Sequence, residues 1–253
     1  MAQFYANDNS PHHHEVLPGA FAYPNRGIGV DLATEDAEDL VEGLTESFIL
    51  SYPHLANRLQ TLNRHVNEIY DSFIQVLLQT LKLRDIETRE HTNRVTSLTL
   101  QLGYRMGLHR AQLNNLRWGA LLHDIGKIAI PDAILFKPGK LTPEEWKLMR
   151  LHPVYAYQIL SGISYMGPAI EIPYLHHEKW DGTGYPLGLK KDAIPLSARI
   201  FAIVDVWDAL SSKRPYRDAW ERDEILSHIR MQSGKHFDPN VVHGFMELIH
   251  KGI

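Results

Sequence analysis

The clearest pattern of apolar and polar positions lies between residues 59 and 76. Apolar side chains recur there at alternating steps of three and four residues, at Leu59, Leu62, Val66, Ile69, Phe73 and Val76. This spacing puts them on one face of a long helix. The repeat is too short to identify what packs against this stripe. It could be the protein's own core, or the same helix of a second copy in a homodimer.

Helical spacing continues along the rest of the chain, and no convincing alternation typical of strands interrupts it. The helical ranges are 93–106, 110–123, 142–161, 195–211 and 219–231. At the start of one of them, Thr142-Pro143-Glu144-Glu145 combines a capping Thr, a Pro at the first helical position and a Glu at the third. Glycine-rich stretches at 162–167 and 181–188 are expected to be loops. The pattern predicts an all-α protein.

Three segments are expected along the chain. Residues 1–30 contain several Pro, Gly and Asn without periodic apolar spacing, which indicates an irregular lead-in. Residues 31–80 form a smaller, mainly helical region that carries the apolar stripe. Residues 81–253 form the main helical domain.

Charge and composition narrow the function. The 253 residues contain 26 Lys and Arg against 30 Asp and Glu, a formal net charge of -4, so a DNA- or RNA-binding surface is not expected. The first ten residues lack the features of a secretory signal, and no later apolar run reaches membrane-spanning length. No membrane partner is therefore expected, and a cytoplasmic location is the default. The chain has no cysteine, which excludes thiolate chemistry.

The pair His123-Asp124 follows an apolar stretch at the end of a predicted helix, so we expect it to be buried. A buried carboxylate costs several kcal/mol unless a partner compensates its charge. Either a metal ion or a hydrogen bond from the neighbouring histidine would do so, and the dipeptide alone does not choose between them. Lys127 stands one turn later and would point its ammonium toward whatever the site binds.

Other candidate ligands surround this pair. His176-His177 precedes the glycine-rich segment that ends in Gly184-Tyr185-Pro186, and consecutive imidazoles on diverging vectors suit a metal site. Asp205 and Asp208 lie one turn apart on an apolar helix, where one would bind metal and the other would orient a ligand histidine. Further candidates share the ability to bind metal or phosphate: Glu87, His91, His152, Arg214 and Arg217. Imidazole and carboxylate ligands suit iron, manganese or zinc, and clustered cations suit phosphodiester cleavage.

These motifs resemble, in order, those of the HD-GYP subfamily of HD-domain phosphohydrolases. The resemblance rests on His123 to Lys127, Ile130 to Asp132, His176 to Pro186, Asp205 to Leu210, Arg214 to Arg217 and Gly234 to Pro239. It covers roughly residues 80–253, and several long ordered motifs make it specific. It implies an HD-type helical bundle that hydrolyses cyclic di-GMP, a bacterial second messenger, to the linear dinucleotide pGpG and often on to GMP.

The resemblance also implies roles for individual residues. The implied metal ligands are Glu87, His91, His123, Asp124, His152, His176, His177 and Asp205. Asp124 would bridge two metals, Glu87 would serve a third, and iron or manganese is expected. Asp124 and Lys127 would be catalytic. The implied substrate contacts are Lys127, Gly184, Tyr185, Pro186, Arg214 and Arg217.

Two other readings stay open. The substrate could be another cyclic dinucleotide, such as 3′,3′-cyclic GMP-AMP, because the residues that would read the bases cannot be chosen from the sequence. A receptor that binds the nucleotide without turnover belongs to a different class, although the intact set of ligands and Lys127 argues against it.

Overall fold

The computed structural model describes residues 51–82, 89–213 and 218–250. Every regular element in these ranges is a helix, and the predicted all-α fold is confirmed. The α-helices are α3 (Pro53–Lys82), α4 (Arg89–Arg105), α5 (Arg110–Leu121), α6 (Asp132–Leu135), α7 (Pro143–Met149), α8 (His152–Leu160), α9 (Glu171–Leu175), α10 (Leu196–Ser211), α11 (Arg222–Met231) and α12 (Pro239–His250). Short 3₁₀ segments are η1 (Ile125–Ala129), η2 (Ser164–Ile170) and η3 (Lys191–Ala193).

The chain divides into two compact units between Ser72 and Phe73, within helix α3. The predicted apolar stripe lies on this helix, and its side chains are exposed. Leu59 is 54% exposed, Ile69 65% and Val76 58%. An exposed apolar stripe of this length is a candidate contact surface.

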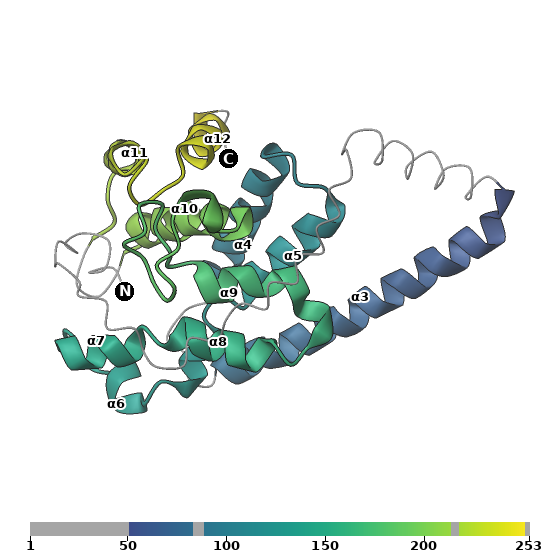
Figure 1. Ribbon diagram of the computed structural model, residues 1–253, viewed down its shortest axis with the longest axis horizontal. Coiled ribbons are helices and arrows are strands. Elements are labelled where there is room, and N and C mark those ends of the chain that lie inside the picture. The colour runs from purple at the N-terminus through teal and green to yellow at the C-terminus, as the bar shows by residue number, and fades with distance from the viewer. Residues whose placement is uncertain (1–50, 83–88, 214–217, 251–253) are drawn as a thin grey trace. The chain divides into compact units, whose positions relative to one another are not determined.

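The core of the larger unit is built around α10, which packs against α4, α9, α11 and α12 (Figure 1). Eleven of its sixteen residues are buried, so the helix is apolar on nearly every side. Its Phe201 belongs to one continuous apolar cluster that includes side chains of α4, α5 and α12, such as Leu102, Leu116 and Phe245. A helix enclosed in this way holds its few polar side chains in fixed positions.

One predicted helix is wrong in its extent. The range 142–161 is two helices, α7 and α8, separated at Arg150 and Leu151. Pro153 explains the break, because it has no N–H to donate to the carbonyl of Met149, four residues earlier. The predicted start at Thr142 is correct, with reciprocal hydrogen bonds between Thr142 and Glu145.

Among the helices of the described residues, none combines the length and the apolar character that crossing a bilayer requires.

Candidate metal centre

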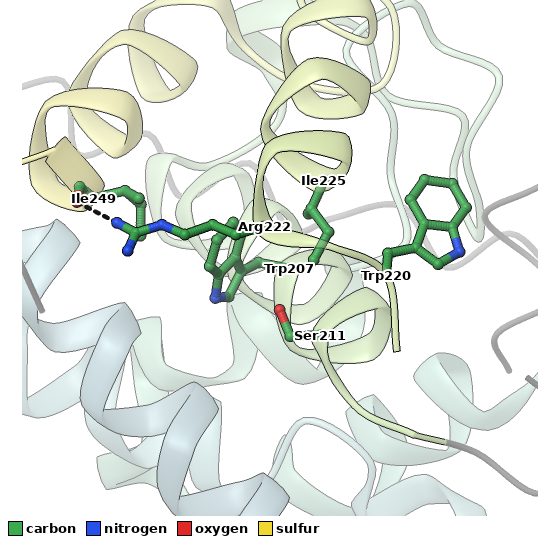
Figure 2. Close-up of a pocket in the computed structure, with 6 residues that line it drawn as sticks. All are labelled: Trp207, Ser211, Trp220, Arg222, Ile225 and Ile249. Carbon is green, nitrogen blue, oxygen red and sulfur yellow. Dashed lines mark hydrogen bonds between the residues drawn. The ribbon is translucent and has the colours of Figure 1, made fainter. Parts of the chain in front are cut away.

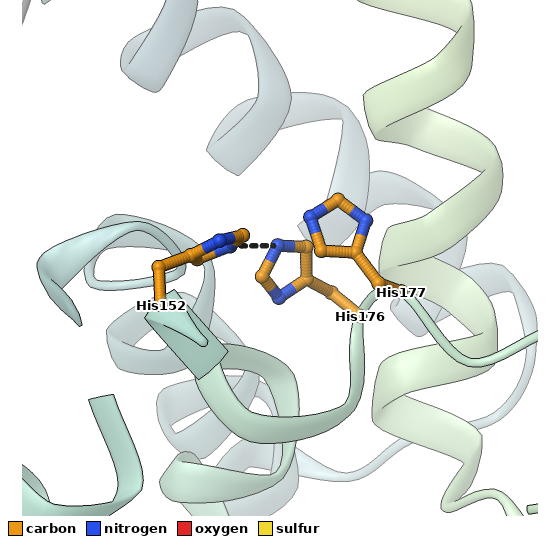
Figure 3. Close-up of side chains that lie close together, drawn as sticks. All are labelled: His152, His176 and His177. Atoms are coloured by element: carbon orange, nitrogen blue, oxygen red, sulfur yellow. Dashed lines mark hydrogen bonds between the residues drawn. The ribbon is translucent and has the colours of Figure 1, made fainter. Parts of the chain in front are cut away.

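The predicted ligands come together as two buried clusters. The first contains His91 from α4, His123 from the turn after α5, and Asp205 from α10. The second contains His152, at the start of α8, with His176 and His177 from the turn after α9 (Figure 3). Within each cluster the candidate ligand atoms lie within 4.8 Å of one another, which is the spacing of donors around a single ion.

Asp124 lies between the two clusters. Its Oδ2 is 3.0 Å from Nε2 of His123, in the first cluster, and its Oδ1 is 3.3 Å from Nε2 of His152, in the second. The ammonium of Lys127 lies 2.6 Å from Oδ2 and is buried with it. One carboxylate thus faces both clusters, the arrangement that a ligand shared by two cations requires.

Three histidines are oriented by backbone carbonyls near the ends of short helices. Nδ1 of His123 lies 2.9 Å from the carbonyl of Ala120, and Nδ1 of His176 lies 2.9 Å from that of Ile172. These carbonyls belong to the last turns of α5 and α9. The carbonyl of Ile172 also accepts the backbone N–H of His176 at 3.0 Å, so one acceptor holds both the backbone and the ring of this residue. Donation from Nδ1–H leaves Nε2 as the atom with a lone pair, turned toward the cluster.

The third of these histidines depends on the break between α7 and α8. The carbonyl of Met149, which Pro153 cannot engage, accepts from Nδ1 of His152 at 2.9 Å. Its Nε2 then lies 3.5 Å from Nε2 of His176 (Figure 3). The proline that ends the predicted long helix therefore frees the carbonyl that positions a candidate ligand.

His91 is oriented differently, by a side chain. Its Nδ1 lies 2.7 Å from Asp208, which also accepts two hydrogen bonds from the guanidinium of Arg94, at 2.6 and 2.9 Å. Although burial opposes it, hydrogen bonds from His91 and Arg94 lower the pKa of Asp208 to about 2. Asp208 therefore stays ionised and holds His91 in place, while Asp205 lies in the cluster itself.

The three histidines of the second cluster are in the protonation state that binds metal. Burial lowers the pKa of His152 to about 3, and it lowers the pKa of His176 and His177 as well. All three imidazoles are neutral at neutral pH, when their Nε2 or Nδ1 lone pairs can coordinate an ion. Five imidazoles and two carboxylates, without a thiolate, form a donor set that fits divalent transition metals.

The segment 184–186 is folded back onto the second cluster. A Cβ at Gly184 would lie 2.3 Å from the backbone nitrogen of Lys179, so only glycine fits this crossing. The next residue, Tyr185, stacks its ring on His177 with centroids 4.7 Å apart, and it precedes Pro186 through a cis peptide bond. The predicted substrate segment therefore borders the metal centre.

Glu178 was not predicted to have a role, yet it holds the three residues that follow this segment. Its buried carboxylate accepts three backbone hydrogen bonds, from Leu187 at 2.7 Å, Gly188 at 3.1 Å and Leu189 at 2.9 Å. Burial raises the pKa of Glu178 to about 7, although these three bonds oppose the shift. Its position directly after His176-His177 was the only signal in the sequence.

Three predicted site residues, Glu87, Arg214 and Arg217, lie outside the described residues. A separate depression with a volume of about 290 Å³ lies between α10, α11 and α12 (Figure 2). Its lining residues are Trp207, Ser211, Trp220, Arg222, Ile225 and Ile249, and none of them belongs to the two clusters. Arg222 spans part of it with a hydrogen bond to the carbonyl of Ile249.

Comparison with known proteins agrees with the motifs. The family model described as "HD domain" matches residues 75–241. The chain belongs to the HD-domain family, and it is of the HD-GYP type. A cyclic di-GMP phosphodiesterase of Thermotoga maritima is 39% identical over 77% of this chain and 55% of its own length. A 3′3′-cGAMP-specific phosphodiesterase of Vibrio cholerae is 41% identical over 72% of this chain and 35% of its own length.

The chain thus spans about half the length, or less, of these curated relatives. A solved HDGYP protein of Bdellovibrio bacteriovorus has a TM-score of 0.54 at 18% identity, over 88% of this chain and 75% of that chain. This likeness confirms the predicted HD-type helical fold.

Proposed function

We propose that the protein is a metal-dependent phosphodiesterase that hydrolyses cyclic di-GMP to the linear dinucleotide pGpG. The observation that carries this proposal is Asp124, whose two oxygens face two separate histidine clusters. Relatives near 40% identity that bear the name of cyclic di-GMP phosphodiesterase support the choice of reaction.

Two divalent ions would occupy the clusters, one in each, with Asp124 shared between them. Glu87 would supply a ligand for a third. Iron and manganese suit the imidazole and carboxylate donors equally. When bound, such ions stabilise negative charge on a phosphoryl group and lower the pKa of a water molecule toward about 7.

The chain's own residues would hold and polarise the substrate. Lys127, 2.6 Å from Asp124, places a buried positive charge beside the shared carboxylate, where it would stabilise charge that develops on phosphoryl oxygens. Tyr185, stacked on His177, would limit the substrate pocket on one side. Arg214 and Arg217 are proposed as further phosphate contacts.

A second substrate has specific support. One relative at 41% identity is named as specific for 3′3′-cGAMP, so this mixed dinucleotide is the alternative to cyclic di-GMP. Both substrates present the same 3′,5′-phosphodiester to the metals. They differ in one base, so the comparison of their rates tests specificity separately from chemistry.

The test is chromatography of the products formed by the purified protein, loaded with ferrous iron or with manganese. We expect pGpG from cyclic di-GMP, loss of product with a chelator, and slower cleavage of 3′3′-cGAMP. GMP would show that pGpG is cleaved again. Faster cleavage of 3′3′-cGAMP would reverse the substrate assignment, and absence of product from either dinucleotide with metal-loaded protein would contradict the proposed reaction.

We also propose that α3 forms a homodimer through the stripe at Leu59, Leu62, Val66, Ile69, Phe73 and Val76. Its strict steps of three and four are those of a coiled-coil seam, and its side chains are exposed. Glutamate at both Ile69 and Phe73 should halve the mass measured by light scattering. Glutamate at Thr61 and Gln75, exposed positions off the stripe, is the matched control. An unchanged mass for the variant at Ile69 and Phe73 would contradict the proposed dimer.

A further inference from the structure

Arg150 lies beside the metal centre without belonging to it. It is the C-cap residue that follows α7, two positions before His152. Its guanidinium carbon lies 5.3 Å from the centre of the Tyr185 ring, and that ring stacks on His177. A single aromatic ring thus links this guanidinium to the second histidine cluster.

Both partners of this contact are anchored by their backbones. The N–H of Arg150 donates to the carbonyls of Trp146 and Leu148 at the end of α7. The N–H of Tyr185 donates to the carbonyl of His177 at 3.2 Å, and Glu178 holds the residues that follow. Since neither backbone is free to drift, the cation–π contact fixes the guanidinium at the border of the site.

The chemistry of the proposed substrate explains why a guanidinium would be needed there. A cyclic dinucleotide carries two phosphates, and only one can react at the metal ions at a time. Lys127, the buried cation beside the carboxylate that faces both clusters, is already paired with Asp124. A planar guanidinium on a half-buried side chain can donate two parallel hydrogen bonds to the other phosphate.

We infer that Arg150, held by Tyr185, binds the phosphate of the cyclic dinucleotide that does not react. This inference rests on the proposed function. It makes Arg150 a determinant of affinity for substrates with two phosphates, separate from the residues that act on the scissile bond. A role limited to supporting Tyr185 would instead affect every substrate of the site.

A substrate with only one phosphate separates these roles. Bis(p-nitrophenyl) phosphate contains a single phosphodiester and tests the metal centre alone. We expect Arg150→Ala to raise KM for cyclic di-GMP at least tenfold, because a charge-assisted hydrogen bond is lost. It should leave kcat/KM for bis(p-nitrophenyl) phosphate within about twofold, and Arg150→Lys should recover part of the lost affinity. Metal content, measured by mass spectrometry, should not change.

Arg230→Ala, which removes an exposed arginine from α11, is the matched control for net charge. A double-mutant cycle with Tyr185→Ala adds a second readout. If Arg150 binds phosphate, its loss still raises KM when Tyr185 is absent; if it only supports the ring, the second loss has no further effect. Equal losses on both substrates, or no loss on either, would overturn the assignment.

Failure of the proposed function is recognised separately, in the wild-type protein. If the wild type cleaves bis(p-nitrophenyl) phosphate but no cyclic dinucleotide, the substrate proposal fails. Calorimetry with cyclic di-GMP then tests Arg150 directly, since at least tenfold weaker binding by Arg150→Ala supports the contact. Equal affinity of the two proteins, or no binding by either, overturns it.

Discussion

The two histidine clusters are built by different means. The first takes His91 and Asp205 from long helices, α4 and α10, and orients His91 through the Asp208 side chain, which Arg94 also holds. Its third member, His123, is oriented by the backbone carbonyl of Ala120, so the side-chain support belongs to His91. The second takes His152 and His176 from the ends of short helices and orients both through backbone carbonyls. Side-chain supports can be removed by one substitution, whereas backbone supports fail only when the chain itself moves. The two halves of the site should therefore respond to different mutations.

The largest loss of activity is expected from substitutions at Asp124, where the two clusters meet. His123→Ala with Asp124→Ala removes a candidate ligand of the first cluster and the carboxylate that faces both clusters. Turnover of cyclic di-GMP should fall at least 10³-fold and bound metal should decrease, with helical content unchanged by circular dichroism.

The control for this pair is His243→Ala with Asp218→Ala, which changes the same residue types at exposed positions. Retained turnover in the first variant would place the chemistry elsewhere in the molecule.

A displacement of the α8 backbone should weaken metal binding by the second cluster. A Cβ on Gly126 would lie 1.8 Å from the carbonyl oxygen of His152 and 2.5 Å from the backbone nitrogen of Ala156. Gly126→Ala must therefore push α8 away from η1, at a cost of about 3 kcal/mol of unfolding free energy. The midpoint temperature of thermal denaturation should fall, and so should the metal content of the purified protein.

Gly162→Ala is the matched control, because a Cβ there would meet nothing within 4 Å. Its stability should stay within about 0.5 kcal/mol of the wild type. If Gly126→Ala were equally neutral, α8 would not be fixed by its close packing on η1.

A side-chain support should be the weak point of the first half. Asp208→Asn keeps the shape but removes the charge that holds His91 and Arg94. Losing such a support typically weakens metal affinity about 10- to 100-fold, which competition with a fluorescent chelator would measure. Asp218→Asn, at an exposed carboxylate, should have no effect. An unchanged metal affinity in Asp208→Asn would mean that the helix packing alone orients His91.

The sequence reveals the candidate ligands of this site better than their supports. His123-Asp124, His176-His177 and Asp205 are visible as motifs because such chemistry needs these residue types close together in the chain. Glu178 shows its role only in the folded loop, since its partners are backbone amides nine to eleven residues later. No local pattern specifies which amides a loop will bring back to a carboxylate.

Two features of the fold have clear signals in the sequence but were not predicted from it. Helix α12 has buried residues at Val241, Val242, Phe245 and Ile249, a helical spacing that begins after Pro239. The break between α7 and α8 was signalled by Pro153, which the continuous apolar spacing across 142–161 concealed. The apolar period reports which face is buried, and proline decides where the backbone can remain helical.

The smallest expected effect comes from the start of α7. It tests whether the position of His152, in the second cluster, depends on the whole of α7 or only on its C-terminal end. Thr142→Ala removes the N-cap of α7, whose hydroxyl accepts a hydrogen bond from the N–H of Glu145 at 3.3 Å. The unfolding free energy should fall by about 1 kcal/mol, measured by denaturant titration, and Thr142→Ser should restore most of it. Metal affinity should not change, because the carbonyl of Met149 orients His152 at the opposite end of the helix. If affinity fell together with stability, the support of His152 would extend through the whole of α7 and the second cluster would be as easily disturbed as the first.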